Sequence, residues 1–391
     1  MADDILPYGR QWIEQDDLEA VIEALRGVYL TTGPTVARFE AALAKAVGAG
    51  HAVAVCNGTA ALHAACAAAG LGPGDEVLVP ALTFLATANC ARYVGAEPVF
   101  VDVDPDSGLI DCEDAARRMT SKTRAILPVH LTGRPAELDA VAALARAHDL
   151  TVIEDAAHAL GARYHDDPIG DCSRAAMSIF SFHPVKHVTT AEGGAITTND
   201  PALAEAMRVF RSHGMIREPR RLREPSPGPW YYEQQSLGYN YRITDLQCAL
   251  GLSQLAKLPR FLERRWTLAA RYDAQLAELE HVRPVAAGTA QTVSGYHLYA
   301  VLIDFAAAGI DRAAVMAGLR EHGVLTQVHY IPVPAQPYYR DRGADMGEYP
   351  GAQSYYERTL SLPMFPAMDD TDVDRVVEAL RAVLASGRAR A

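Results

Sequence analysis

The sequence predicts an α/β fold, in which a large domain with a mostly parallel seven-stranded sheet precedes a smaller C-terminal α+β domain. Short apolar runs alternate with stretches of helical periodicity along roughly the first half of the chain. Runs such as 77–79 (Val-Leu-Val) and 99–101 (Val-Phe-Val) are continuously apolar, which is typical of strands covered on both faces. With 391 residues, of which 49% are hydrophobic, the chain can bury a large core.

Two amphipathic helices are expected before the first strand. Asp16 and Asp17 precede apolar residues at the spacing of one helical face, and a second such pattern covers 36–47. Strands are then expected at 51–56, 76–79, 98–103, 124–129, 150–154, 176–181 and 194–198. The last two strands are too close in sequence for a helix to lie between them, which favours an antiparallel pair.

The second half of the chain opens with a segment of different composition. Residues 214–236 are rich in proline and arginine and predict a long mobile loop. Thr244 and Gln247 have the spacing of a capping box, which predicts that a helix starts there. The smaller unit is expected to contain a strand near 298–303, a helix at 311–322, a strand at 325–328 and a helix around 373–384. We therefore predict domains at 1–250 and 251–391, with the N-terminal helix able to pack on the smaller one.

The composition narrows the class of protein. A net charge of −12 argues against a nucleic-acid partner, and there is no apolar run of about 18 residues to predict a membrane span. The six cysteines are scattered without Cys-x-x-Cys spacing, so we expect reduced thiols and no metal site. The N-terminus shows no secretion signal. A cytoplasmic location is expected.

One lysine stands in an unusual setting. Lys186 lies in the segment 178–194, which follows an apolar run and places Phe182, His183 and His187 around the amine. A lysine held in apolar surroundings loses its proton near neutral pH and can form a Schiff base with an aldehyde. A surface lysine beside a turn is the alternative, so the assignment depends on other residues.

Two further strand ends carry suitable groups. Asp155 ends an apolar strand, and the carboxyl ends of parallel strands converge on a ligand crevice. A carboxylate there can keep a pyridine nitrogen protonated, although a helix cap is the alternative. Gly58 and Thr59 open an alanine-rich helix after a strand, where free N–H groups can hold a phosphate, unless this is an ordinary turn. A phosphate cradle, a carboxylate for a ring nitrogen and an activated lysine occur together in this chain. This combination predicts pyridoxal 5′-phosphate as the cofactor.

Nearly the whole chain resembles the DegT/DnrJ/EryC1/StrS family of sugar aminotransferases, a branch of the fold-type-I pyridoxal-phosphate aminotransferases. Besides the lysine segment, the resemblance rests on residues 30–34, 57–60, 72–77, 83–89, 154–158, 211–214 and 238–242. The segments 182–194, 210–215, 249–255 and 327–330 are most similar to members that make UDP-4-amino-4,6-dideoxy-N-acetyl-β-L-altrosamine on the pathway to pseudaminic acid.

The resemblance implies a role for each matching residue. Lys186 would be the catalytic residue and would bind the cofactor covalently, while Asp155 would pair with the pyridine nitrogen. The other cofactor contacts would be Thr59 and Ala60 (backbone N–H groups to the phosphate), Ser181 (a hydroxyl to the phosphate), Phe84 (stacking on the ring), His158 (near the ring 3′-oxygen) and Asn240 (reaching the phosphate from the neighbouring subunit). The substrate would meet His329, Tyr330 and Arg242. Plain core packing for Phe84 and a simple strand-end hydroxyl for Ser181 remain alternatives.

The expected reaction moves the amino group of L-glutamate to C4 of a UDP-linked 4-keto-6-deoxy-N-acetylhexosamine, in a homodimer with shared active sites. A transaminase of another nucleotide-linked keto sugar, such as a GDP-linked one, is the alternative, and a non-catalytic scaffold that binds the cofactor is a third. Thr132 and Arg134 depart from the tyrosine and glutamine of many relatives, which leaves the local substrate contacts open. Related dehydratases replace the lysine with histidine, so the presence of Lys186 disfavours dehydration.

Overall fold

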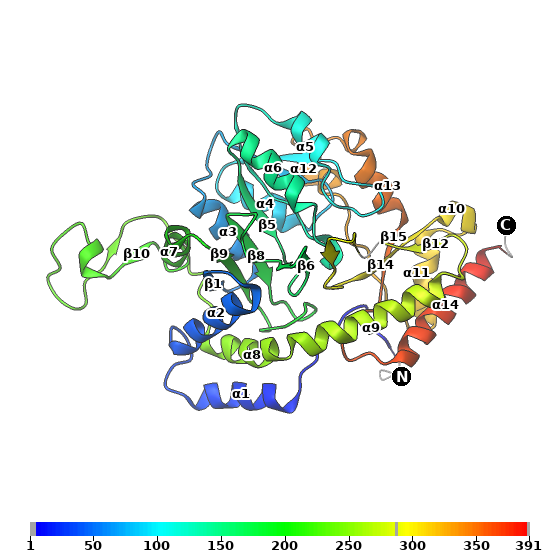
Figure 1. The fold of residues 1–391 in the computed structure, drawn as a ribbon, viewed down its shortest axis with the longest axis horizontal. Coiled ribbons are helices and arrows are strands. Elements are labelled where there is room, and N and C mark those ends of the chain that lie inside the picture. The colour runs from blue at the N-terminus through cyan, green and yellow to red at the C-terminus, as the bar shows by residue number, and fades with distance from the viewer. Residues whose placement is uncertain (1–4, 286–287, 389–391) are drawn as a thin grey trace.

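A computed structural model describes residues 5–285 and 288–388 of the chain. Its centre is a sheet with the strand order β1-β9-β8-β5-β4-β2-β3 (Figure 1). The seven strands are β1 (His51–Val55), β2 (Glu76–Pro80), β3 (Glu97–Val101), β4 (Thr123–Ile126), β5 (Thr151–Asp155), β8 (Met177–Ser181) and β9 (Gly194–Thr198). All seven lie where the sequence predicts a strand. The predicted antiparallel pair is confirmed, because β9 runs antiparallel to both β8 and β1 while the other pairs are parallel.

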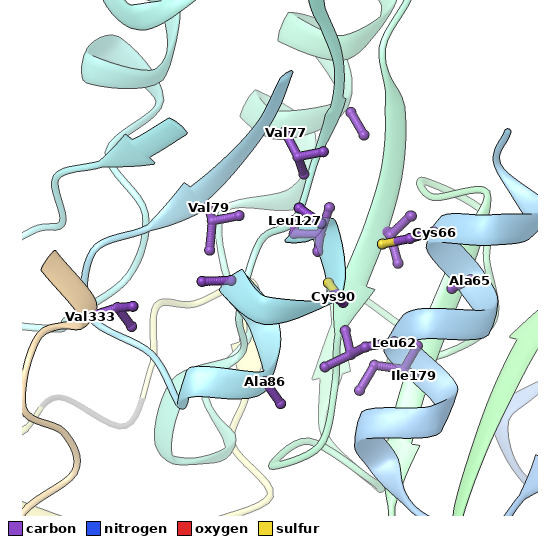
Figure 2. Close-up of a cluster of buried hydrophobic side chains, with 14 of the residues drawn as sticks. Leu62, Ala65, Cys66, Val77, Val79, Ala86, Cys90, Leu127, Ile179 and Val333 are labelled. Atoms are coloured by element: carbon purple, nitrogen blue, oxygen red, sulfur yellow. The ribbon is translucent and has the colours of Figure 1, made fainter. Parts of the chain in front are cut away.

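Helices cover both faces of this sheet, as the continuous apolar strands require. Alternate residues of one strand enter different cores: Val77 and Val79 of β2 pack with one face, and Leu78 packs with the other. The first face carries α3 (Gly58–Ala68), α4 (Leu85–Tyr93) and α7 (Pro201–Phe210), and the second carries α2 (Pro34–Val47), α5 (Cys112–Arg118), α6 (Leu138–His148) and α8 (Asp245–Ala256). Figure 2 shows the first core, where Leu62 and Cys66 of α3 lie beside Cys90 of α4.

A smaller antiparallel sheet lies towards the other end of the molecule, at the right of Figure 1, in the order β12-β14-β15. Its elements are β12 (Val282–Pro284), β14 (Tyr299–Ile303), β15 (Thr359–Leu362), α9 (Leu258–Leu276), α10 (Phe305–Ala308), α11 (Arg312–Glu321), α13 (Pro350–Arg358) and α14 (Asp370–Arg388). These confirm the predicted strand and the two predicted helices. The strand predicted at 325–328 is wrong, because Val324 bridges to Leu6 whereas Gln327 bridges to Ser361, so no continuous ladder forms.

The remaining elements are short or peripheral. They are α1 (Gln15–Arg26), β6 (Arg163–Tyr164), β7 (Asp167–Pro168), β10 (Met215–Ile216), β11 (Glu233–Gln234), β13 (Thr292–Val293) and α12 (Pro337–Arg340). Residues 214–236 extend from the body at the left of Figure 1 as an arm with a two-stranded base, β10 paired with β11. None of the helices in the described ranges has the length and hydrophobicity that crossing a membrane requires.

The helix boundaries follow local chemistry. Thr244 and Gln247 form the predicted capping box: Gln247 N–H donates to Thr244 Oγ1 at 3.2 Å, and Thr244 N–H donates to Gln247 Oε1 at 3.0 Å. The resulting helix, α8, spans the predicted domain boundary between residues 250 and 251, and α9 then leads to the smaller sheet. The division into 1–250 and 251–391 stays a prediction.

Candidate active site

A cavity of about 710 Å³ lies at the carboxyl ends of β5 and β8, where the topology of a parallel sheet gathers loop residues. Its wall combines the first turns of α3 and α4, the lysine loop, and the segment 327–331. Among the predicted site residues, those that line it are Thr59, Phe84, Asp155, His158, Ser181, Lys186, His329 and Tyr330. These residues come from five separate stretches of sequence, which therefore meet in one place.

Lys186 projects from the turn that follows β8, where its backbone N–H donates to His183 O at 2.9 Å. The neighbouring Phe182 and Val188 are buried and anchor the loop on both sides of the lysine. The side chain is partly open to the cavity, but the surrounding protein removes most of the water from its amine. This desolvation lowers the pKa of Lys186 to about 7, and the nearby Asp155 carboxylate opposes the shift. A large fraction of the amine is therefore uncharged and nucleophilic near neutral pH.

Asp155 ends β5 and is 6% exposed. Both of its oxygens accept hydrogen bonds: Oδ2 from Thr87 Oγ1 at 2.7 Å, and Oδ1 from the Ala157 N–H at 3.1 Å. Burial raises the pKa of Asp155, whereas these two donors and the charge of Lys186 act in the opposite direction. The carboxylate is thus fixed in orientation, and it would be the counter-charge for a protonated ring nitrogen of a bound cofactor.

The first turn of α3 has the geometry of a phosphate cradle. Asn57 is the N-cap, and the first N–H groups of a helix have no acceptor within the helix. Gly58 brings this turn close to β8, because a Cβ at position 58 would stand 3.1 Å from Ser181 Cβ. Thr59 and Ser181 line the cavity here. Ala60 is not among the described lining residues, and its N–H donates to Asn57 Oδ1 at 2.8 Å, so its phosphate contact stays a prediction.

The far wall of the cavity is aromatic. Tyr330 contacts His158, with 3.1 Å between the hydroxyl and His158 Nε2, and its ring centroid lies 5.8 Å from that of Phe84. His329 is held from behind, since its Nδ1 lies 2.9 Å from Ser361 Oγ. Burial lowers the pKa of His158 well below its ordinary value and that of His329 to about 3, so both rings are neutral at physiological pH.

Residues 11–381 match the model of the DegT/DnrJ/EryC1/StrS aminotransferase family. The chain belongs to this family. It is 41% identical over 382 residues to the spore coat polysaccharide biosynthesis protein SpsC of Bacillus subtilis (strain 168), a match that covers 97% of both chains.

Two solved family structures are similar over the same extent. The putative sugar aminotransferase Spr1654 from Streptococcus pneumoniae, in its PMP form, is 30% identical with a TM-score of 0.91, covering 98% of this chain and 100% of that one. Helicobacter pylori PseC, an aminotransferase involved in the biosynthesis of pseudoaminic acid, is 30% identical with a TM-score of 0.89 and the same coverage. This member of the DegT/DnrJ/EryC1/StrS family is a fold-type-I sugar aminotransferase, and its cofactor is pyridoxal phosphate.

The cavity residues fit that cofactor. A helix N-terminus with Ser181 beside it would supply donors to the phosphate, the buried carboxylate would supply a counter-charge to the ring nitrogen, and the amine with a depressed pKa would react with the aldehyde. The volume leaves room for a substrate next to the cofactor. Lys186, Asp155, Thr59 and Ser181 are the residues that would hold it.

Two residues that were predicted to belong to the site lie outside the cavity of their own chain. Asn240 and Arg242 are not among the described residues that line the cavity. Asn240 is exposed and forms an isolated antiparallel bridge with Ser212, and Arg242 is half-buried. Because Asn240 is expected to act on the neighbouring subunit, a position outside its own cavity is what that role requires. Both assignments stay predictions.

Sequence reasoning missed other cavity residues. His297 Nε2 lies 3.4 Å from Lys186 Nζ, although the two residues are 111 positions apart. Thr87 holds Asp155 across 68 positions, and Tyr8 reaches the cavity from the N-terminal segment. Only tertiary structure joins these pairs. The sequence signal for His297 is weak: it is a histidine two residues before an apolar strand, and a packed core histidine is the alternative there.

Proposed function

We propose that the chain transfers the amino group of L-glutamate to C4 of a UDP-linked 4-keto-6-deoxy-N-acetylhexosamine, on the pathway to pseudaminic acid. The observation that carries an amino-transfer reaction is the single cavity in which an uncharged Lys186 amine stands with the buried Asp155 carboxylate. What supports the particular sugar is the resemblance of segments 182–194 and 327–330 to members with that substrate, together with the overall similarity to PseC.

Each residue has a defined task in this reaction. When bound, pyridoxal phosphate withdraws electrons from the carbon that carries the amino group and so makes its C–H bond acidic. Asp155 keeps the ring nitrogen protonated, which this withdrawal needs. Lys186 Nζ takes the proton from the α-carbon of glutamate, and in the second half it delivers a proton to C4 of the sugar. An amine whose pKa is about 7 can both accept and release a proton near neutral pH.

The aromatic wall positions the substrate. Tyr330 is fixed by His158 and lies next to Phe84, so the hydroxyl and the ring present one polar and one apolar contact to the cavity. His329 belongs to the same wall and is neutral. We assign Tyr330 and His329 to the sugar, and Arg242 to the negatively charged nucleotide moiety, which would require Arg242 to act from a second subunit.

We also propose a homodimer with shared active sites. Asn240 points to this arrangement, because it is exposed and lies outside the cavity of its own chain. Several large apolar residues are exposed in the monomer, including Val28 at 90%, Leu237 at 75% and Phe84 at 54%. Phe84 belongs to the cavity wall itself, so a second copy that covered it would close the site. The six cysteines are all free thiols, which supports a cytoplasmic location.

The decisive experiment identifies the product. Purified holoenzyme is incubated with L-glutamate and, in parallel, with the UDP-linked 4-keto-6-deoxy-N-acetylhexosamine and a GDP-linked 4-keto-6-deoxyhexose, and the amino sugar is analysed by mass spectrometry and NMR. We expect 2-oxoglutarate and a 4-amino sugar with the UDP substrate. Turnover of the GDP sugar alone would assign the enzyme to another nucleotide sugar. Conversion of neither sugar, with no change in cofactor absorbance on adding glutamate, would favour a scaffold.

The second candidate is a transaminase of a different nucleotide-linked keto sugar. The observation that favours it is the 41% identity to SpsC, a spore coat polysaccharide biosynthesis protein, which exceeds the 30% identity to PseC. Of the two departures from many relatives, Thr132 lies next to the segment that carries the cavity residue His297, because Leu298 N–H donates to Thr132 O. The comparison of UDP- and GDP-linked substrates above separates the two candidates.

A further inference from the structure

Among the residues that the structure describes, the amine of Lys186 has one side-chain hydrogen-bond partner, and this partner is His297. Their nitrogens, Nζ and Nε2, are 3.4 Å apart. His297 is 3% exposed and lines the cavity two residues before β14, so it reaches a site built mainly by the larger sheet from the smaller one. The rest of the lysine's surroundings offers no alternative hydrogen-bond partner among those described, apart from the carboxylate of Asp155 at a distance.

We propose that His297 is a positioning residue for amino transfer, which holds the Lys186 amine in place whenever that amine is not bonded to the cofactor. The inference rests on the proposed role of Lys186, but not on the identity of the sugar. It concerns the orientation of the amine and one hydrogen bond, and the proton that moves during the reaction is carried by Lys186 Nζ and not by His297.

The ring of His297 can pair with the amine in both of its protonation states. A protonated Lys186 donates to a bare Nε2, and a neutral Lys186 accepts from an Nε2–H. The tautomer of a histidine is set by the partner of its other nitrogen. His297 Nδ1 is buried and has no hydrogen-bond partner among the described residues, so nothing fixes the ring in one tautomer. This freedom suits a residue whose partner must gain and lose a proton.

The charges around His297 keep the ring itself neutral. Burial is the largest cause that lowers its pKa well below the ordinary value, followed by the positive charge of Lys186. The other titratable groups that face it are His158, His187 and the guanidinium of Arg265, which act in the same direction. His158 is particularly near, with 4.4 Å between the two ring centroids. A neutral imidazole does not compete with Lys186 for the proton.

The backbone of His297 is held by a buried arginine. Arg265 of α9 is fully buried, and its Nη1 donates to three carbonyls: Tyr296 O at 2.9 Å, His297 O at 3.2 Å and Met364 O at 3.1 Å. These carbonyls belong to the approach to β14 and to the residues after β15. Arg265 therefore ties α9 to the two strands of the smaller sheet at the point where His297 enters the site.

A turn of the large domain holds the same segment from the other side. Leu298 N–H donates to Thr132 O at 3.1 Å, and Gly295 N–H donates to Gly133 O at 2.9 Å. Gly133 has a φ of +101°, and a Cβ there would come within 2.8 Å of His297 N, so the close approach requires glycine. His297 is thus placed by contacts from both sheets, in the way that functional side chains with a demanding geometry are supported.

Two variants separate the effect of the His297 Nε2 hydrogen bond from the effect of the size of the side chain. In His297→Gln the amide group reaches the position of the ring Nε2, whereas in His297→Asn it stops near that of Nδ1. Both are polar and smaller than or similar to histidine, so both should fold, which thermal unfolding will check. The exposed His148 at the end of α6 supplies the matched control, His148→Gln.

The first readout needs neither cofactor nor sugar. In the cofactor-free proteins, Lys186 is acetylated with acetic anhydride at a series of pH values, and peptide mass spectrometry gives the pKa of its amine. We expect His297→Asn to lower this pKa by roughly one unit, because the ammonium form loses its hydrogen bond, and His297→Gln to stay near the wild-type value.

The second readout is the half-reaction with L-glutamate. We expect kcat to fall about 10- to 100-fold in His297→Asn with little change in KM, and to be largely restored in His297→Gln. Equal behaviour of the two variants, whether both active or both impaired, would overturn the proposal, since the position of the nitrogen would then not matter. A shifted lysine pKa in a protein that aminates no UDP sugar would leave this inference standing and refute the proposed substrate.

Discussion

Thr87 Oγ1 donates a 2.7 Å hydrogen bond to Asp155 Oδ2, which links the first turn of α4 to the end of β5 beneath the cavity. Thr87 is completely buried, and its hydroxyl also lies 2.8 Å from Thr83 Oγ1. The carboxylate that is assigned to the cofactor ring is therefore not a free side chain. Its orientation and charge depend on a helix that contributes Phe84 to the same site.

Thr87→Val should weaken cofactor binding. The substitution keeps the shape of the side chain but removes a donor to a buried carboxylate, so the pKa of Asp155, already raised by burial, rises further. A hydrogen bond to a charged group is worth about 1.5–3 kcal/mol, which corresponds to a loss of roughly 10- to 100-fold in affinity. Titration of the cofactor-free protein with pyridoxal phosphate measures this, with Thr267→Val on the exposed face of α9 as the control. An unchanged dissociation constant would show that Thr87 does not tune Asp155.

The role of the phosphate cradle can be tested by a substitution at Gly58 that fills the space between the first turn of α3 and Ser181. In Gly58→Val the added carbons would meet Ser181, because a Cβ alone would already stand 3.1 Å from Ser181 Cβ. We expect affinity for pyridoxal phosphate to fall by about tenfold or more, while affinity for pyridoxal, which has no phosphate, changes little. Gly72→Val is the control, since nothing lies closer than 4.0 Å to a Cβ at that position. Equal losses for both aldehydes would point to general damage instead.

The depressed pKa of Lys186 makes stability depend on pH. Its folded value of about 7 lies below the ordinary 10.5, so between these limits the unfolded chain binds one more proton than the folded chain. The contribution of this residue to stability therefore rises with pH in that window and is constant below it, with a slope of about 1.4 kcal/mol per pH unit. Denaturant unfolding of the cofactor-free wild type and Lys186→Met, from about pH 6 to about pH 10, checks this. The stability difference between the two proteins should shrink as the pH rises, and a pH-independent difference would contradict the assigned pKa.

Shared active sites predict complementation between two inactive variants. Lys186→Ala removes the amine and Asn240→Ala removes the group expected to cross between subunits. In a mixed dimer one site carries both changes and the other carries neither. Equal mixing after dissociation and reassembly should restore about a quarter of wild-type activity, because about half of the dimers are mixed and each has one intact site. A mixture no more active than its components would exclude Asn240 from the site of the neighbouring subunit.

Much of the fold follows from local sequence. The seven strands of the large sheet lie in continuous apolar runs, and the capping box at Thr244 marks a helix start that the structure confirms. The strand predicted at 325–328 does not form, because Val324, just before it, bridges to Leu6 whereas Gln327 bridges to Ser361, and only the tertiary structure brings these partners together. Hydrophobic pattern alone could not distinguish these two isolated bridges from one ladder.

The candidate site was predictable where its residues follow strands. Lys186 and Asp155 stand at or just after strand ends, and the topology of a parallel sheet directs both to one cavity. His297 could not be placed in this way, because its position depends on Arg265 and on the turn at Gly133, both remote in sequence. Long-range contacts of this kind leave no periodic signal in a single chain.

The most direct test of the account is covalent. The purified protein is mixed with pyridoxal phosphate, reduced with borohydride, digested and analysed by mass spectrometry. We predict one phosphopyridoxyl group on Lys186, and none on Lys186→Ala treated in the same way. A modified peptide that lacks residue 186, or no fixed adduct in the wild type, would contradict the central claim that this amine forms the bond to the cofactor.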